Sequence, residues 1–221
     1  YRIDVCVPSG NFGNIYAGFL ARSMGVPIRR LILATNENNV LEEFFTTGIY
    51  RPRSAADTLA TSSPSMDISK ASNLERFIWA LLGPEAFAQR WSELESTGTL
   101  DLRDQLPRLG EDFGFVAGTS SHADRLEAIR SVKERSGRLI DPHTADGVTV
   151  ALRTMEPGFP TLVMETAKAA KFPQTVAEAL GTEPETPAVI ADLLAQPQKV
   201  ETIDNEEAPL RHLIEKRALT I

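Results

Sequence analysis

The chain has little of what marks a secreted or membrane-bound protein. Its 221 residues include one cysteine, Cys6, which excludes an internal disulfide and suits a reducing compartment. The longest apolar stretch, residues 77–82, is far too short to span a bilayer. We therefore expect a cytoplasmic protein that has no contact with a membrane, and we interpret Cys6 itself as a small apolar residue of a buried strand.

Positive charge is also scarce. The formal net charge is −7, and the lysines and arginines are scattered along the chain. Because proteins bind nucleic-acid phosphates with clusters of Lys and Arg, we expect no nucleic-acid partner. An anionic ligand would need a local device for binding, since the overall field of the protein repels it.

The sequence also lacks an initiating methionine, and a buried strand is predicted two residues after Tyr1. A domain rarely opens in the middle of a sheet. We therefore expect this chain to be part of a longer protein, with an N-terminal half as its partner.

The first 35 residues have the pattern of a βαβ unit. Residues 3–7 form a short apolar run rich in β-branched side chains, which is typical of a strand buried in a parallel sheet. Residues 15–24 have helical spacing, and residues 30–35 form a second strand. This pattern predicts an α/β fold with a largely parallel, doubly wound sheet.

The middle of the chain differs. Residues 59–66 read as a Ser/Thr/Pro loop, and Ser72-Asn73-Leu74-Glu75 predicts a capping box that opens a helix to about Leu82. Another helix is predicted over 84–95. We interpret residues 60–115 as a mostly helical insertion, and residues 1–59 and 116–221 as the α/β portion.

The α/β pattern then resumes. We predict a helix from Ser121-His122-Ala123-Asp124 to about Gly137, and helical segments in the tail. The remaining predicted elements are a strand at 138–140, a helix at 147–155, a strand at 161–165, and a tail that is helical with proline punctuation over 173–194 and 209–219.

The strongest motif is the loop between the first strand and the first helix, made of Ser9, Gly10, Asn11, Phe12, Gly13 and Asn14. Its two glycines permit positive φ and a close approach of the backbone, so successive N–H groups can face one anion. The following helix adds its unpaired N–H groups and the positive end of its dipole. Residues 3–21 contain no Lys or Arg, so backbone amides would hold the anion. The alternative is a tight turn that binds nothing.

The loop Pro-Ser-Gly-Asn-Phe-Gly-Asn (8–14) resembles the pyridoxal-phosphate loop of threonine synthases, which are fold-type II enzymes. The resemblance continues in the family's order through further segments, which together cover most of residues 5–172. These are Ala-Thr-Asn-Glu-Asn-Asn-Val-Leu (34–41), Phe-Phe-Thr-Thr-Gly-Ile-Tyr (44–50), Ser-Pro-Ser-Met-Asp-Ile-Ser (63–69), Ser-Asn-Leu-Glu-Arg (72–76), Asp-Pro-His-Thr-Ala-Asp-Gly (141–147) and Glu-Thr-Ala-Lys-Ala-Ala-Lys-Phe (165–172).

The resemblance implies conversion of O-phospho-L-homoserine and water to L-threonine and phosphate, with pyridoxal phosphate as cofactor and electron sink. The family's Schiff-base lysine lies upstream, in an Ala-Phe-Lys-Asp-like segment that this sequence lacks. Lys70, Lys168 and Lys171 belong to other motifs. We therefore expect no catalytic residue here, and no activity from the chain alone.

The resemblance also implies that the Thr166 hydroxyl bonds the pyridine nitrogen of the cofactor. From the residues alone, Thr166 is equally a β-branched residue at the end of the last strand. Substrate contacts are expected from Asn36 and Asn38 after the second strand, although Asn38 or Asn39 could simply cap the next helix.

Three further residues are candidates for binding substrate. Ser65 and Asp67 lie in the Ser/Pro-rich loop, which could be only a loop. His143 is either near the substrate or a turn histidine. Asp141, His143 and Asp146 lie in one short turn with no matching ligands elsewhere, so we predict no metal.

Two rival functions remain open at this point. One is another fold-type II enzyme, such as a dehydratase or β-replacement synthase. The other is a non-catalytic phosphate-binding module.

Overall fold

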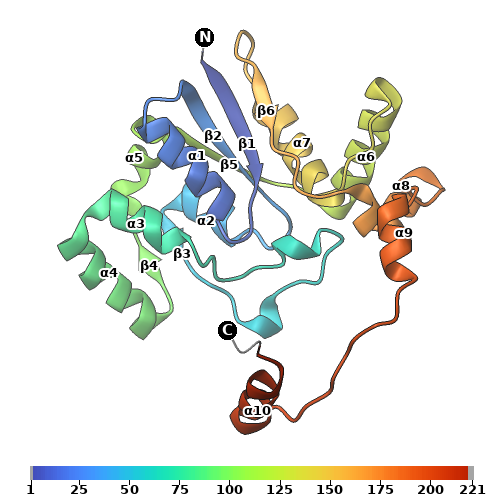
Figure 1. Ribbon diagram of the computed structural model, residues 1–221. Helices are drawn as coiled ribbons and strands as arrows, with labels where there is room; N and C mark the ends of the chain where they lie inside the picture. The colour runs from blue at the N-terminus through green and yellow to red at the C-terminus, as the bar shows by residue number, and fades with distance from the viewer. Residues whose placement is uncertain (1, 219–221) are drawn as a thin grey trace. The chain divides into compact units, whose positions relative to one another are not determined.

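The computed structural model describes residues 2–218 (Figure 1). The chain divides into two units, Tyr1–Glu185 and Thr186–Ile221. The first unit contains both sheets and all of the predicted site residues.

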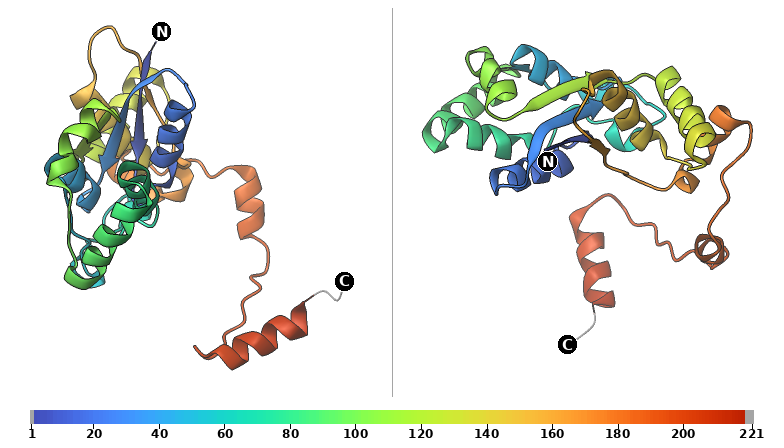
Figure 2. Two further views of the ribbon diagram at one scale, coloured as in Figure 1. Left: turned by 90° about the vertical axis from the view of Figure 1, so that its left-hand side faces the viewer. Right: turned by 90° about the horizontal axis from the view of Figure 1, so that it is seen from above.

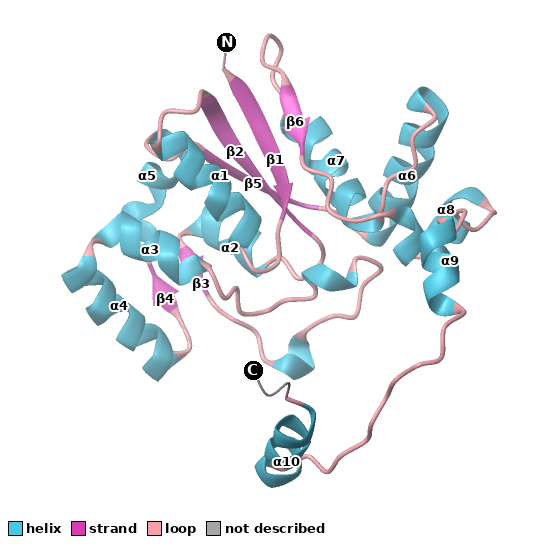
Figure 3. Ribbon diagram, in the orientation of Figure 1, coloured by secondary structure: helices cyan, strands magenta, loops and turns pink. Residues whose placement is uncertain are grey.

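The first unit is built on a four-stranded parallel sheet with the order β5-β2-β1-β6 (Figure 3). Its strands are β1 (Ile3–Pro8), β2 (Ile28–Thr35), β5 (Phe115–Thr119) and β6 (Thr161–Val163). Helix α1 (Gly13–Ser23) connects β1 to β2, as the sequence predicts. The α/β class and the parallel sheet are confirmed.

Helices cover both faces of this sheet, which confirms the doubly wound arrangement (Figure 2). On one face, Val7 and Leu33 pack into the main core with α1 and α2 (Val40–Thr47). On the other face, Cys6 and Ile32 pack against Val150 of α7 (Pro142–Thr154). Successive strand residues therefore alternate between two cores.

Between β2 and β5 the chain is mostly helical. It contains 3-10 turns at Ala55–Asp57, Pro64–Met66 and Arg103–Gln105, and the helices α3 (Leu74–Leu82), α4 (Pro84–Thr97) and α5 (Leu106–Glu111). A small antiparallel pair, β3 (Ile49–Tyr50) and β4 (Leu100–Asp101), was not expected from the sequence. Two-residue strands leave too little periodicity to detect.

After β5, helix α6 (His122–Ser136) lies where the sequence predicts a helix, and its N-cap Ser121 forms a capping box with Asp124. The predicted strand at 138–140 is wrong. Leu139 and Ile140 instead form the connection from α6 to α7 and pack on a small core with Ile129 and Ala145. An apolar run this short does not distinguish a strand from a buried connection.

The predicted start of α7 is also wrong. The helix begins at Pro142, because Asp141 caps it through the N–H of His143. Gly147 therefore lies inside the helix, where a Cβ atom would come 3.0 Å from side-chain atoms of both Pro8 and Val163. Its lack of a side chain lets α7 pack close to β1 and β6.

The first unit ends with a 3-10 turn at Ala169–Lys171 and helix α8 (Pro173–Leu180). The second contains α9 (Ala188–Leu194) and α10 (Glu207–Arg217). Residues 173–194 are helical with a break, as predicted: α8 ends before Gly181, which has a φ of 76°, and α9 begins after Pro187. Leu219, the predicted end of the last helix, lies outside the described residues. Within residues 2–218, no helix is both long enough and apolar enough to cross a membrane.

Candidate functional site

The loop between β1 and α1 leaves a row of main-chain donors available. The N–H of Ser9 donates to the Ala34 carbonyl at 2.8 Å, and the N–H of Tyr16 donates to the Phe12 carbonyl at 3.0 Å. Between them, the N–H groups of residues 10–15 have no hydrogen-bond acceptor within residues 2–218. They lie at the N-terminus of α1, where the helix dipole favours negative charge.

The backbone geometry of this loop depends on Phe12. Only Phe12 has a positive φ here, at 65°, so the expectation that the glycines supply it is wrong. Gly10 instead allows a close approach, because a Cβ atom there would lie 2.9 Å from Ile68 Cγ1 and 3.0 Å from Met66 Cα. The segment containing Met66 and Ile68 therefore fits directly against the loop.

The loop side chains contribute less than its backbone. The Ser9 hydroxyl is buried and donates to the Val7 carbonyl at 3.3 Å. The carboxamide oxygen of Asn11 accepts from the Ser72 hydroxyl at 3.2 Å. Asn14 is exposed and makes no side-chain hydrogen bond within the described part of the chain. The free donors of the loop are therefore chiefly amide groups.

The capping box predicted at Ser72–Glu75 does not form. Asn73 is the N-cap of α3, and its side chain makes no capping bond. The Asn73 amide nitrogen donates instead to the Asn11 carbonyl at 3.1 Å, as does its main-chain N–H. The start of α3 is thus fastened to the loop, and this contact competes with the local cap.

Asn36, Asn38 and Asp67 lie together, but they bond to one another. The amide nitrogens of both asparagines donate to Asp67 Oδ1, at 2.9 and 3.0 Å. The Asn38 amide nitrogen also donates to the Leu59 carbonyl at 2.9 Å, and Asn38 Oδ1 accepts the Leu59 N–H at 2.8 Å. These side chains fix the loop that contains Ser65, and substrate contact by them stays a prediction.

His143 is buried and joins this loop to α7. Its Nδ1 lies 2.8 Å from Asp141 Oδ1, and its Nε2 accepts the N–H of Ser65 at 3.0 Å. Since a carboxylate only accepts, Nδ1 carries the hydrogen in this arrangement. Burial raises the pKa of Asp141, but hydrogen bonds from His143 and Thr144 outweigh it, so this pKa lies below the ordinary value.

Thr166 lies beyond β6, which ends at Val163, so its expected place at the end of the strand is wrong. Its N–H donates to Thr144 Oγ1 at 3.0 Å. Its side chain is exposed, and its hydroxyl makes no hydrogen bond among the described residues. The hydroxyl is therefore available to a ligand.

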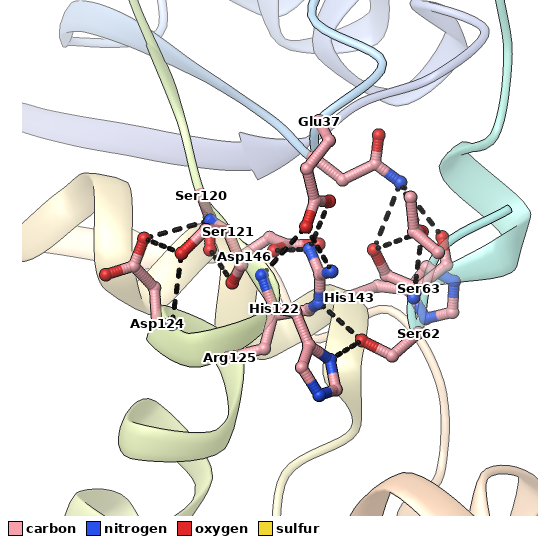
Figure 4. A network of polar contacts seen from close by, with 12 residues as sticks. Glu37, Ser62, Ser63, Ser120, Ser121, His122, Asp124, Arg125, His143 and Asp146 are labelled. Carbon is pink, nitrogen blue, oxygen red and sulfur yellow. Dashed lines mark hydrogen bonds and ion pairs between the residues drawn. The ribbon is translucent and has the colours of Figure 1, made fainter. Parts of the chain in front are cut away.

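A buried charge cluster at the ends of β2 and β5 was not expected from the sequence (Figure 4). The guanidinium of Arg125, fully buried, lies 2.8 Å from a Glu37 oxygen and 3.0 Å from Asp146 Oδ1. Burial raises the pKa of Asp146 to about 6, although Arg125 lowers it. A cavity of about 400 Å³ lies beside the cluster. It is lined by Glu37, Leu59, Ala60, Thr61, Ser62, His122 and Arg125.

One signal for this cluster was present in the sequence. His122 and Arg125 are three residues apart and so share one face at the start of α6. Charged helix residues are usually solvated, so the pattern alone does not reveal burial. Within residues 2–218 there is no group of three or more His, Cys, Asp or Glu residues able to hold a metal.

Comparisons with known proteins find similarity to threonine synthases. Residues 144–214 match the family model described as threonine synthase, C-terminal. The chain is 49% identical over 217 residues to a threonine synthase of Methylobacillus glycogenes, covering 96% of this chain and 46% of that protein. It is 49% identical over 220 residues to one of Corynebacterium glutamicum, covering 96% of this chain and 45% of that protein.

Solved structures give the same result. A pyridoxal-phosphate-bound threonine synthase from Brucella melitensis matches with a TM-score of 0.86 and 36% identity, over 98% of this chain and 46% of that one. Yeast threonine synthase matches with a TM-score of 0.86 and 30% identity, over 97% and 47%. The chain spans about half the length of these relatives. Over nearly its whole length, the chain is similar to the C-terminal part of threonine synthases.

Proposed function

We propose that this chain is the C-terminal part of a pyridoxal-phosphate-dependent threonine synthase. The whole enzyme would convert O-phospho-L-homoserine and water to L-threonine and phosphate. The observation that carries the proposal is the run of main-chain N–H groups at residues 10–15, which have no acceptor among the described residues and lie at the N-terminus of α1. Such a group of amides suits a phosphate dianion without any cationic side chain.

The residues present fit the cofactor at both of its ends. Amides of the loop formed by residues 9–14 would hold its phosphate, and Gly10 leaves the space that this packing requires. The free hydroxyl of Thr166 would bond the pyridine nitrogen. When bound, pyridoxal phosphate supplies the electron sink of the reaction. A neutral hydroxyl at that nitrogen stabilises positive charge less than a carboxylate would.

The substrate would bind near the loop held by Asn36, Asn38 and Asp67. The exposed side chain of Ser65 projects from this loop, while His143 supports the same turn from behind through the Ser65 N–H. We further propose that an N-terminal half supplies the lysine that anchors the cofactor. The single cysteine suits a cytoplasmic location for the enzyme.

The test is an assay of the longer protein that contains this chain together with the upstream half found in its relatives. We expect phosphate release from O-phospho-L-homoserine, no ammonia release from serine or threonine, and no activity from residues 1–221 alone. Deamination of serine or threonine without phosphate release would instead identify another fold-type II enzyme. Absence of any pyridoxal-phosphate binding by the longer protein would overturn the proposal.

A further inference from the structure

The buried carboxylate of Asp141 connects the start of α7 to the segment that follows β6. Its Oδ1 accepts the N–H of His143 at 2.9 Å and the Nδ1 hydrogen of the same residue at 2.8 Å. Its Oδ2 accepts the hydroxyl of Thr144 and the N–H of Ala167 at 3.1 Å. The first of these bonds is enough to cap α7, so the other three need a different explanation.

These remaining bonds lead outward to the candidate site. The Thr144 hydroxyl gives its hydrogen to Asp141, so its oxygen is left to accept the N–H of Thr166 at 3.0 Å. His143 likewise gives its Nδ1 hydrogen to Asp141 and accepts the N–H of Ser65 with Nε2 at 3.0 Å. The carboxylate thus sets the direction of the hydrogen in both links.

We propose that Asp141 is a positioning residue that acts through Thr144 to hold the main chain of Thr166, leaving the Thr166 hydroxyl free to face the cofactor ring. This inference rests on the proposed function for the role of that hydroxyl. Asp141 is fully buried, so it would touch neither cofactor nor substrate. Through His143, the same carboxylate holds the turn that presents Ser65.

Variants of Thr144 can distinguish this positioning role from simple helix capping by Asp141. Thr144→Val removes the acceptor for the Thr166 N–H and leaves the bond between Asp141 and the His143 N–H in place. Thr144→Ser keeps the hydroxyl and so tests rescue. Thr149→Val is the matched control, since Thr149 is a buried residue of the same helix whose hydroxyl makes no hydrogen bond within residues 2–218.

The experiment uses the longer protein and two readouts other than turnover. Amide hydrogen exchange is followed at Thr166 and Ala167, and the dissociation constant of pyridoxal phosphate is measured by titrating the cofactor-free protein. For Thr144→Val we expect exchange at Thr166 to be about tenfold faster and the cofactor to bind about tenfold more weakly. Thr144→Ser should restore both values, and Thr149→Val should change neither.

One result overturns the inference. If Thr144→Val leaves both the exchange at Thr166 and the cofactor affinity at the values of the Thr149→Val control, Asp141 only caps α7. The proposed function is tested separately, by measuring the activity of the unmodified longer protein. A protein that binds cofactor and loses affinity in Thr144→Val, but releases no phosphate from O-phospho-L-homoserine, supports the positioning role and refutes the proposed reaction.

Discussion

Phe12 stacks on Phe45, with ring centroids 5.6 Å apart and planes inclined by 13°, although the backbone of Phe12 has a φ of 65°. A left-handed conformation at a residue other than glycine costs roughly 1–2 kcal/mol. Aromatic pairs of this kind contribute about 0.5–1.5 kcal/mol each, and Phe12 also lies within 6 Å of Phe77 and Phe115, at 5.8 and 5.9 Å. The core therefore holds the loop in the shape that leaves its amides free.

This relationship predicts an unusual order of stability at position 12. Phe12→Ala removes the buried ring and should lower the free energy of unfolding by about 3–5 kcal/mol. Phe12→Gly removes the same ring but relieves the left-handed strain, so it should be about 1 kcal/mol more stable than the alanine variant. Urea denaturation of both variants measures the difference. If the alanine variant were the more stable, the left-handed geometry would be wrong.

Gly10 gives a second prediction, because its lack of a side chain leaves room for the segment that contains Met66 and Ile68. In Gly10→Ala the new Cβ atom meets Ile68 and the Met66 backbone, so the free energy of unfolding should fall by about 1–3 kcal/mol. Gly110→Ala is the matched control, since Gly110 lies within α5 and the nearest atom to its new Cβ, the Phe115 carbonyl oxygen, would be 3.9 Å away. The control should be as stable as the unmodified chain or slightly more so, by thermal denaturation. Equal losses in the two variants would contradict the close approach at Gly10.

The two capping-box motifs give a third prediction. Ser121 accepts the N–H of Asp124 and starts α6, so Ser121→Ala should lower the free energy of unfolding by about 1 kcal/mol. Ser72 caps nothing and bonds Asn11 in an exposed position, so Ser72→Ala should cost only a few tenths of that. Denaturation of the two variants under one set of conditions compares them directly. A larger loss at Ser72 would mean that the box does form in solution.

These two motifs also show how far the sequence predicts the fold. Local patterns were sufficient for β1, the glycine loop, α1 and the start of α6, where neighbouring residues supply the hydrogen-bond partners. At Ser72 the same pattern failed, because the Asn11 carbonyl, far away in the sequence, attracts Asn73 instead. A tertiary contact replaced the local one, and no local pattern encodes that choice.

The candidate site likewise has one part that the sequence predicts and another part that it does not. The loop at residues 9–14 could be proposed as an anion site from the sequence, because its glycines and amide groups are adjacent in the chain. The links through Asp141 and the Arg125 cluster were not visible, because they join residues from different elements. Glu37 and Arg125 are 88 positions apart and meet only when β2 and α6 are placed beside each other by the sheet. Charged residues on a helix are usually exposed to solvent, but this fold buries Arg125.

The buried cluster predicts a pH dependence that originates in Asp146. Its pKa in the folded protein is raised to about 6, above the ordinary value of 3.8, so the folded state holds this proton more tightly than the unfolded state. Its contribution therefore favours the folded state below pH 4 and is lost as the pH rises through 6. The full change is on the order of 3 kcal/mol. Asp146→Asn cannot titrate, so the difference in unfolding free energy between the unmodified protein and this variant should shift across that window.

The matched control is Asp124→Asn, on a carboxylate whose pKa shift has the opposite sign. Burial raises the pKa of Asp124, but hydrogen bonds from Ser121 and the charge of Arg153 outweigh it and hold the pKa below its ordinary value. Its contribution is present above about pH 4 and lost as the pH falls further. Urea denaturation from pH 3.5 to 7.5 should therefore give the two variants differences of opposite slope. A difference for Asp146→Asn that stays constant between pH 4 and 6 would mean that Asp146 is ionised throughout and that Arg125 fully neutralises it.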